Sequence, residues 1–442
     1  MLLLYNIFIR LYFLGIRLAS LWNKKAAQWI KGRESLFDDV SSKVAKADKI
    51  IWVHCSSAGE FEQGKPVIEA LKARYSTHKI VVSFFSPSGY AVATNYAVAD
   101  VITYLPLDTK KNARAFINLL KPELAIFVKY EFWYHHLATA SFHHIPVLLI
   151  SATFRKEQVF FKGYGTFFRQ ILFLFRHIFV QDKASLDLLK ENAVAQASIS
   201  GDTRFDRVKK IADNFAEIKF IKDFAGEKKL VVAGSTWADD EQLLAEYAQK
   251  NPDIKFIIAP HEINAANLAN VSHRFPNVYR YSWLEKEEQF FPLPNTDGPK
   301  WMAVPEQQAE HLNKQIITQV QVLIIDSVGL LSRLYQYATI TYVGGGFTKD
   351  GIHNTLEAAV WGKPVIFGPN YKKYREAKEL IAAGGGFSVP NADELKKLAD
   401  ELLSNEQYLQ AVGEKAKKYI QDNTGATEKI LQEIQAKRLL TN

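Results

Sequence analysis

Residues 50–72 read IIWVHCSSAGEFEQGKPVIEALK. The first six form a short run of apolar and β-branched side chains, which is typical of a buried strand and too short for a buried helix. Glycine follows, and Pro66 suits the first turn of a helix. The stretch therefore predicts a strand, a glycine-containing turn and a helix, which is the repeating unit of a parallel α/β sheet.

The same unit recurs in two series along the chain. In the first series the predicted strands are 50–55, 79–85, 124–128, 146–151 and 177–180. In the second series they are 230–234, 255–259, 322–326, 339–343 and 364–368. Helical periodicity fills the intervals, and the polar segment 206–229 separates the two series. We therefore expect two Rossmann-like domains with a cleft between them, covering residues 25–214 and 215–442.

Two other segments have a less regular pattern. Residues 24–49 are basic and are predicted to be a linker, whereas segment 283–315, which contains FFPLPNTDGPKW, has no clear period and is predicted to be a loop insertion.

The composition is that of an ordinary globular protein. The 442 residues are 48% hydrophobic and 23% charged, which excludes general disorder. Cys55 is the only cysteine, so an internal disulfide framework and a cysteine-based zinc or iron–sulfur cluster are excluded. A reducing compartment is consistent with this usage.

Charge is distributed unevenly along the chain. The net charge is +8, but residues 1–214 contain 29 basic and 18 acidic residues, whereas the remainder contains 26 and 29. The basic half is expected to face an anionic partner. The sequence contains no helix-turn-helix, zinc finger, RNP motif or arginine-rich tract, so a membrane surface or an anionic lipid is favoured over nucleic acid.

The N-terminus reads MLLLYNIFIRLYFLGIRLASLWNKK. On a helix Asn6, Arg10, Arg17, Ser20 and Lys24 form one polar stripe, and apolar side chains cover the rest. Residues 1–24 are therefore predicted to be an interfacial amphipathic helix that anchors the protein to a membrane. Two arginines disfavour a simple membrane span, and the late Arg17 disfavours a cleaved signal peptide. A spanning helix, or a helix packed on the protein's own core, is the alternative.

Glu60 follows the first predicted strand. The surrounding GEFEQGK matches the phosphate-binding P-loop until Pro66, where that motif requires Ser or Thr, and Glu60 and Glu62 would place carboxylates in a phosphate cradle. A P-loop is therefore rejected. Open α/β sheets bind ligands at the carboxyl ends of their strands, so Glu60 can act there as a general base. His54 and Cys55 have no metal-ligand partner at a suitable spacing and are interpreted as packing or supporting residues.

A second carboxylate follows the strand at 124–128. The sequence ELAIFVKYEFWYHHL places Glu131 just past that strand, so Glu60 and Glu131 could converge on one cleft. Two carboxylates suit glycosyl transfer, because one accepts a proton and the other stabilises positive charge at an oxocarbenium-like centre. An exposed loop glutamate without a catalytic role is the alternative for each. His135 and His136 are adjacent and would point about 100° apart on a helix, so a metal site there is rejected.

A glycine-rich segment lies in the second series. Residues 339–369 read TITYVGGGFTKDGIHNTLEAAVWGKPVIFGP, in which Gly344–Gly346 follow a strand and His353 and Asn354 open a helix. Glycines permit close backbone approach, a helix N-terminus presents N–H groups to phosphate, and Glu357 can accept hydrogen bonds from ribose hydroxyls. The segment predicts a nucleotide-sugar site, with a plain glycine turn and capped helix as the alternative. It lacks the G-x-G-x-x-G spacing of dinucleotide-binding folds.

An ordered series of motifs extends from the N-terminal helix to about residue 390. The motifs are HCSSAGE, YEFW, SATFRKE, SGDTRFD, AGSTWADDE, IAPHE, DSVGLL, GGG…HNTLEAA and FGPNY. On these motifs the chain resembles the Kdo transferases, lipopolysaccharide enzymes that move 3-deoxy-D-manno-octulosonic acid (Kdo) from CMP-Kdo to a lipid A precursor. The resemblance implies a GT-B fold, with acceptor and membrane contacts on the first Rossmann-like domain and CMP on the second.

The resemblance also implies roles for individual residues. Glu60 matches the family's proton acceptor, Glu131 matches the glutamate that stabilises the transition state, and Arg204 stands where the family has a lysine of similar role. The implied CMP contacts are Pro260, His261, Val328, Gly329, Leu330, Asn354, Thr355, Leu356 and Glu357. The sequence departs from the family pattern at Lys129, His261, Gly329–Leu331, Gly346, Ile352 and Thr355.

By this resemblance, the protein is expected to be an inverting transferase with CMP-Kdo as donor and lipid IVA as acceptor. It would act on the cytoplasmic face of a Gram-negative inner membrane and need neither a metal nor another cofactor. The alternatives are a membrane-associated GT-B transferase with a different nucleotide-sugar donor, and a nucleotide-sugar-binding protein without catalysis.

Overall fold

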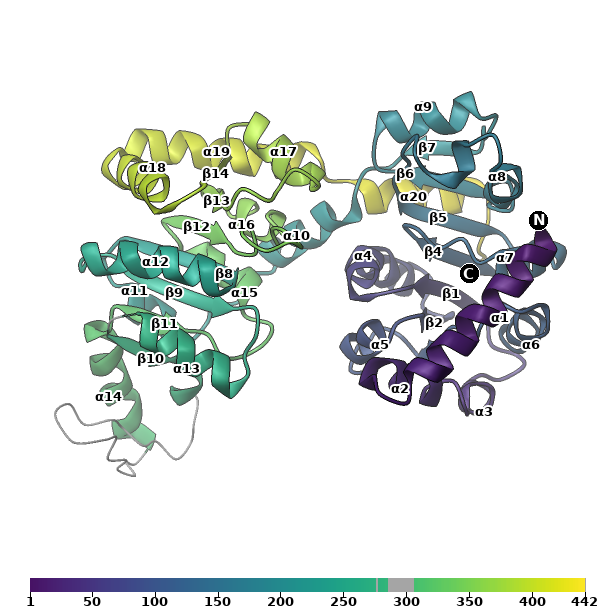
Figure 1. The fold of residues 1–442 in the computed structure, drawn as a ribbon, viewed down its shortest axis with the longest axis horizontal. Helices are drawn as coiled ribbons and strands as arrows, with labels where there is room; N and C mark the ends of the chain where they lie inside the picture. The colour runs from purple at the N-terminus through teal and green to yellow at the C-terminus, as the bar shows by residue number, and fades with distance from the viewer. Residues whose placement is uncertain (276, 285–305, 442) are drawn as a thin grey trace. The chain divides into compact units, whose positions relative to one another are not determined.

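The computed structural model describes residues 1–275, 277–284 and 306–441. The chain divides into two compact units (Figure 1). Unit 1 consists of Met1–Arg207 with Asn423–Asn442, and unit 2 consists of Val208–Asp422. Each unit has its own parallel sheet with helices on both faces, which is the Rossmann-like architecture that the alternating pattern predicts.

Unit 1 contains a seven-stranded parallel sheet in the order β3-β2-β1-β4-β5-β6-β7. Its strands are β1 (Ile50–Cys55), β2 (Lys79–Phe84), β3 (Val101–Tyr104), β4 (Leu124–Val128), β5 (Val147–Ala152), β6 (His177–Val180) and β7 (Ala197–Ile199). Its helices are α1 (Leu2–Ala19), α2 (Lys24–Lys31), α3 (Leu36–Ser41), α4 (Ala58–Arg74), α5 (Pro87–Ala93), α6 (Lys110–Leu120), α7 (Tyr134–Phe142), the 3-10 turn η1 (Val159–Phe161), α8 (Thr166–Leu172), α9 (Lys183–Glu191) and α20 (Ala426–Ala436). Helix α10 (Thr203–Asp213) runs across the boundary into unit 2.

The central strands of unit 1 are apolar because both faces of the sheet are covered. Every residue of β1 and β4 is buried. Apolar side chains from α6, α7, α8 and α9 pack on one face, and those from α4 and α20 pack on the other. The sheet therefore lies in the middle of three layers.

The predicted linker at 24–49 is folded. It contains α2 and α3, and Trp29, Leu36 and Val40 are buried against the rest of unit 1. The linker prediction was wrong because the apolar side chains in this basic segment are few but regularly spaced.

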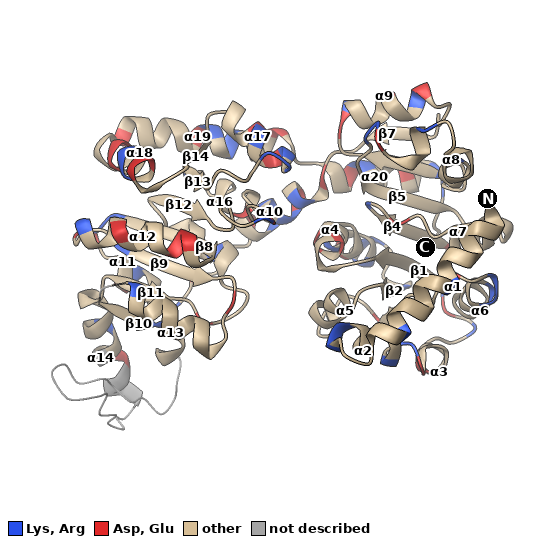
Figure 2. Ribbon diagram, in the orientation of Figure 1, with Lys and Arg blue, Asp and Glu red and all other residues tan. Residues whose placement is uncertain are grey.

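Helix α1 contacts the rest of unit 1 through one narrow stripe of side chains. Ile9 is its buried residue, and Tyr5, Phe13 and Ile16 are half-buried. Its large exposed apolar side chains are Leu2, Leu3, Leu4, Ile7, Phe8, Leu11, Tyr12, Leu14 and Leu18. Among the described residues, α1 alone has the length and apolar composition that crossing a membrane requires. Apart from its two arginines it carries no charge (Figure 2).

Unit 2 repeats the architecture with the order β10-β11-β9-β8-β12-β13-β14. Its strands are β8 (Leu230–Thr236), β9 (Lys255–Pro260), β10 (Val278–Arg280), β11 (Val322–Ile324), β12 (Ile340–Val343), β13 (Val365–Phe367) and β14 (Gly386–Ser388). Its helices are α11 (Ile221–Ala225), α12 (Ala238–Lys250), α13 (Ala265–Arg274), the 3-10 turn η2 (Tyr281–Trp283), α14 (Glu306–Gln319), α15 (Leu331–Leu334), the 3-10 turn η3 (Tyr335–Tyr337), α16 (Leu356–Ala359), α17 (Arg375–Ala382), α18 (Ala392–Ser404) and α19 (Glu406–Asp422).

The division of the chain differs from the predicted domains 25–214 and 215–442 in two places. The first boundary falls at Arg207, within α10. The last twenty residues belong to unit 1, where Ile430 and Ile434 of α20 join the core beside α4. The segment 206–229, predicted to be a polar linker, is largely α10 and α11.

The predicted loop insertion at 283–315 is described only in part. Residues 306–315 belong to helix α14, so the loop prediction was wrong there. Residues 285–305 lie outside the described residues.

Candidate active site

The direction of the strand order in unit 1 reverses between β1 and β4. The chain adds β2 and β3 on one side of β1, and it adds β5, β6 and β7 beyond β4 on the other. Ligands of open α/β sheets bind at the carboxyl ends of the strands at such a switch point. His54 and Cys55 end β1, and Glu131 comes three residues after β4, so both predicted segments lie at this position.

Glu60 lies in the first turn of α4. The prediction that a turn precedes a helix starting near Pro66 was wrong, because α4 begins at Ala58 and Pro66 is buried in its interior. Proline cannot donate the backbone hydrogen bond of that turn, yet the helix continues through the buried Pro66. The hydroxyl of Ser57, the residue before α4, donates to the Glu60 carboxylate.

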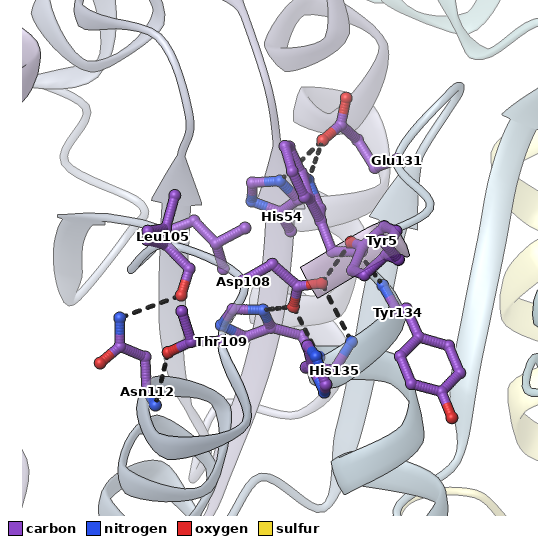
Figure 3. Close-up of polar contacts among 12 residues, drawn as sticks. Tyr5, His54, Leu105, Asp108, Thr109, Asn112, Glu131, Tyr134 and His135 are labelled. Atoms are coloured by element: carbon purple, nitrogen blue, oxygen red, sulfur yellow. Dashed lines mark hydrogen bonds and ion pairs between the residues drawn. The ribbon is translucent and has the colours of Figure 1, made fainter. Parts of the chain in front are cut away.

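Glu131 is buried and held by two N–H donors. His54 Nε2 lies 3.0 Å and Trp133 Nε1 lies 2.5 Å from the same oxygen, Glu131 Oε2 (Figure 3 shows the histidine and the carboxylate). The His54 ring is fully buried, and its Nδ1 lies 2.9 Å from the hydroxyl of Ser83 on the neighbouring strand β2.

The two carboxylates lie near one thiol. Burial raises the pKa of Cys55 well above its usual value, and the negative charges of Glu60 and Glu131 raise it further. Glu60 follows β1 in the first turn of α4, and Glu131 follows β4, the strand paired with β1. The structure thus brings Glu60 and Glu131 to the same end of unit 1.

Arg204 lies in the first turn of α10. Its Nε and Nη2 atoms donate to Asp202 Oδ2 at 3.0 and 2.8 Å. The next-door Thr203 hydroxyl donates to the Gln63 carbonyl of α4 at 2.6 Å. The hydrogen bond of Thr203 therefore fixes the backbone next to Arg204 against α4, the helix that carries Glu60.

A buried carboxylate that the sequence analysis did not single out ties α1 to this end of unit 1. Asp108 accepts hydrogen bonds from the Tyr5 hydroxyl, from the backbone N–H groups of His135 and His136, and from His136 Nδ1 (Figure 3). Burial alone would raise the pKa of Asp108, but these donors outweigh burial and hold it below its usual value. Asn6 of α1 makes a further contact of 2.6 Å with His135 Nε2. No local pattern marks Asp108, because its partners are far away in sequence.

The residues implied to contact CMP gather at the carboxyl ends of the strands of unit 2. Pro260 ends β9, residues 328–330 follow β11, and residues 354–357 follow the glycine segment after β12. The strand order of this sheet reverses between β8 and β12, so these loops surround its switch point.

The segment around Asn354 is less helical than predicted. The expected helix is the four-residue α16, and it begins at Leu356. Asn354 Oδ1 accepts from the Leu356 N–H at 3.1 Å, and Asn354 Nδ2 donates to Glu357 Oε1 at 3.1 Å. Thr355 and Leu356 are fully buried, and the Thr355 hydroxyl has no hydrogen-bond partner among the described residues. Asn354 and the half-buried Glu357 are therefore the side chains of this segment that a ligand can reach.

Three rings contact one another beside these residues. The ring of the exposed His261 packs on those of Trp237 and His353 at centroid distances of 4.8 and 4.5 Å, and Trp237 Nε1 donates to His353 Nε2 at 3.2 Å. Burial, and then the neighbouring His261, lower the pKa of His353 to about 4, so His353 is neutral at pH 7. His261 thus stands in an aromatic setting.

The glycine segment makes close contacts with the protein itself. A Cβ at Gly344 would meet the Ser235 carbonyl oxygen at 2.3 Å, and a Cβ at Gly346 would meet the Gly368 backbone at 2.5 Å. The Gly345 N–H donates to the buried Asp240, also not singled out as a site residue although it lies in the AGSTWADDE motif. The glycines therefore let the loop pack closely against neighbouring strands. The close approach that was predicted for a ligand is made here by the protein backbone.

No group of three or more metal-ligating side chains occurs among residues 1–275, 277–284 and 306–441. The adjacent His135 and His136 contact different partners, Asn6 and Asp108.

Comparison with known proteins bears on this arrangement. Residues 30–207 match the family described as 3-deoxy-D-manno-octulosonic-acid transferase (kdotransferase). The chain is 27% identical over 361 residues to the 3-deoxy-D-manno-octulosonic acid transferase of Aquifex aeolicus, covering 80% of this chain and 86% of that one. It is 25% identical to the enzyme of the same name from Rickettsia felis, covering 93% and 85%. This chain is a relative of the Kdo transferases.

Solved structures support the fold of this Kdo transferase relative. The crystal structure of UDP-GlcNAc 2-epimerase from Neisseria meningitidis has a TM-score of 0.55 and 16% identity, covering 88% of this chain and all of that one. At this identity the likeness concerns the fold alone. It confirms the prediction of a GT-B-like pair of Rossmann-like domains, while the cleft between them stays a prediction.

Proposed function

We propose that the protein is an inverting glycosyltransferase that moves Kdo from CMP-Kdo to a lipid A precursor, lipid IVA, in lipopolysaccharide synthesis. The observation that carries the proposal is the pair of carboxylates, Glu60 and Glu131, at the switch point of unit 1 in a chain whose named relatives are Kdo transferases.

In this proposal unit 1 supplies the reacting groups. Glu60 accepts the proton of a sugar hydroxyl of the acceptor as that oxygen bonds to the anomeric carbon of Kdo. The bond from that carbon to the CMP phosphate breaks, and Glu131 stabilises the positive charge that develops there. Arg204, held by Asp202, supplies a cation where the family has a lysine.

Unit 2 binds the nucleotide in this proposal. Glu357 accepts hydrogen bonds from the ribose hydroxyls, Asn354 meets the phosphate, His261 stands beside them, and Pro260 and residues 328–330 contribute backbone and surface. Val328 is 87% exposed and is thus accessible to a ligand. The leaving group is a phosphate monoester that protein N–H groups and a cation can stabilise, so we propose that no metal is needed.

Helix α1 serves as the membrane anchor in this proposal. Its exposed apolar residues form a continuous surface over the length of the helix, and the N-terminal half of the chain has the basic excess that attracts anionic lipid. We propose that it lies on the cytoplasmic face of the inner membrane, where the lipid A precursor is presented.

The test is a reaction of the purified full chain with CMP-Kdo and lipid IVA, followed by mass spectrometry of the lipid. We expect lipid that has gained Kdo, and competition by CMP but not by UDP. Inhibition by UDP instead would favour a different nucleotide-sugar donor. Nucleotide binding without any change in the lipid would contradict catalysis.

A further inference from the structure

The Glu131 carboxylate is held through one of its two oxygens. Both protein donors, His54 Nε2 and Trp133 Nε1, bind Oε2. Within the described part of the chain, no residue donates to Oε1. A carboxylate has about four lone-pair sites, so the second oxygen keeps its capacity to interact with a substrate.

His54 is itself fixed in orientation. Its Nδ1 lies 2.9 Å from Ser83 Oγ and 3.1 Å from the Ser83 carbonyl oxygen, and Ser83 Oγ also accepts from Trp52 Nε1 at 2.8 Å. Glu131 Oε2 can only accept, so Nε2 meets it as a donor. Ser83 and Trp52 therefore hold the imidazole ring with its Nε2 towards Glu131.

Trp133 is held from its ring face. The indole stacks on Phe85 with a centroid distance of 4.7 Å and an angle of 26° between the planes. Phe85 also packs edge-on against Trp29 of α2 and stacks on Tyr12 of α1. The N–H of Trp133 is thus aimed at Glu131 by packing that extends to the first two helices.

We infer that His54 and Trp133 are positioning residues that hold Glu131 by Oε2 and direct Oε1 to the reacting sugar. The inference rests on the proposed function, in which Glu131 stabilises positive charge at the anomeric carbon. Charge stabilisation depends on placement, and a displacement of about 1 Å can cost about 100-fold in rate.

Two replacements of His54 separate positioning from packing. In His54→Gln the amide nitrogen can reach the place of Nε2 and still donate to Glu131. In His54→Asn the shorter amide reaches the place of Nδ1 and can keep only the Ser83 contact. We expect His54→Asn to lower kcat about 10- to 100-fold with an unchanged KM for CMP-Kdo, and His54→Gln to recover most of that loss. Trp133→Phe keeps the ring stack, removes the N–H and should lower kcat by a similar factor.

The chain offers a matched control at the opposite end of the same sheet. His78 is buried, precedes β2, and contacts Glu123 Oε2 at 3.0 Å, just before β4. His78→Asn disrupts a pair between a buried histidine and a partly exposed glutamate, away from the switch point. It should lower thermal stability and leave kcat within about twofold of the parent.

Combination with Glu131→Gln decides whether His54 acts through Glu131. If it does, His54→Asn adds almost nothing to the loss of kcat in the Glu131→Gln background. Full additivity of the two losses, or equal losses in His54→Asn and His54→Gln, would overturn the inference.

A readout without catalysis keeps this inference separate from the proposed function. In protein labelled with ¹⁵N-histidine, the His54 Nε2–H resonance should shift in Glu131→Gln and stay unchanged in Glu123→Gln. If the parent protein transfers Kdo but the His54 resonance is unchanged in Glu131→Gln, the positioning role is overturned. A signal that depends on Glu131 in a protein that transfers no Kdo supports the pair and contradicts the proposed function.

Discussion

Glu60 occupies the position from which a side chain can reach a substrate beyond the end of β1. It stands in the first turn of α4 and accepts from Ser57. Glu60→Gln keeps its size and removes the base, so we expect kcat to fall about 10²- to 10⁴-fold with the fold intact. The matched control is Glu62→Gln on the same helix, which loses ion pairs with Lys65 and Arg207 and should keep near-parental turnover. Steady-state rates on lipid IVA check this, and equal turnover in Glu60→Gln and the parent would remove Glu60 from the mechanism.

Asp108 links stability to pH. Its pKa in the folded protein lies below its usual value of 3.8, so its contribution to stability is present above that value and is lost as the pH falls through the folded pKa. Asp108→Asn should cost about 1–3 kcal/mol at pH 7, because buried N–H donors lose a charged acceptor. Thermal unfolding measured between pH 3 and 7 should show the gap between variant and parent narrowing towards pH 3. A gap that is constant with pH would contradict an ionised Asp108.

At the scale of whole elements, the sequence predicts the ten central strands of the described sheets and misses four of their strands. The missed strands, β3, β7, β10 and β14, are the two edges of each sheet. They are three or four residues long, and β7 contains no buried residue, because an edge strand is paired and covered on fewer sides. Their short and partly polar runs carry no period that could be recognised.

The candidate site, too, could be predicted from the sequence only in part. Glu60 and Glu131 could be predicted because each follows a central strand and the switch point gathers strand ends. The contact that orients Glu131 could not, since His54 and Glu131 are 77 residues apart. The contact of Tyr5 with Asp108, which holds α1, could not either, because these residues are 103 apart. Only the folded sheet brings these pairs together.

Helix α1 is attached to unit 1 by few contacts. Deleting residues 1–22 removes one buried residue, Ile9, together with the Tyr5 and Asn6 hydrogen bonds. The remainder should therefore fold, with stability lowered by about 1–3 kcal/mol, and should no longer float with liposomes in a density gradient. Retained flotation would place the membrane contact elsewhere, and an unfolded product would make α1 part of the core.

At the scale of the molecule, the proposed function gives the two units separate tasks. Glu357 belongs to unit 2, and loss of a hydrogen-bond acceptor for a ribose hydroxyl costs about 1–3 kcal/mol. Glu357→Ala should thus weaken CMP binding about 5- to 150-fold, because each 1.4 kcal/mol is tenfold in affinity. Glu60→Gln in unit 1 should leave CMP affinity unchanged. Calorimetric titration of CMP into both variants checks this, and a comparable loss in Glu60→Gln would move the donor site.

Unit 1 is made of two segments of the chain, one translated before unit 2 and one translated after it. Helix α20 covers α4 with Ile430 and Ile434, and the N–H groups of Gly425 and Thr427 bind Asp206. These residues are translated after all of unit 2, so the first unit to begin is the last to be completed. A nascent chain that ends at Asp422 and is tethered to the ribosome by an added linker that fills the exit tunnel should resist protease in unit 2 while unit 1 is still cleaved. Unit 2 is thus a folding insertion within unit 1, and a helix translated after unit 2 closes the half that carries the two carboxylates.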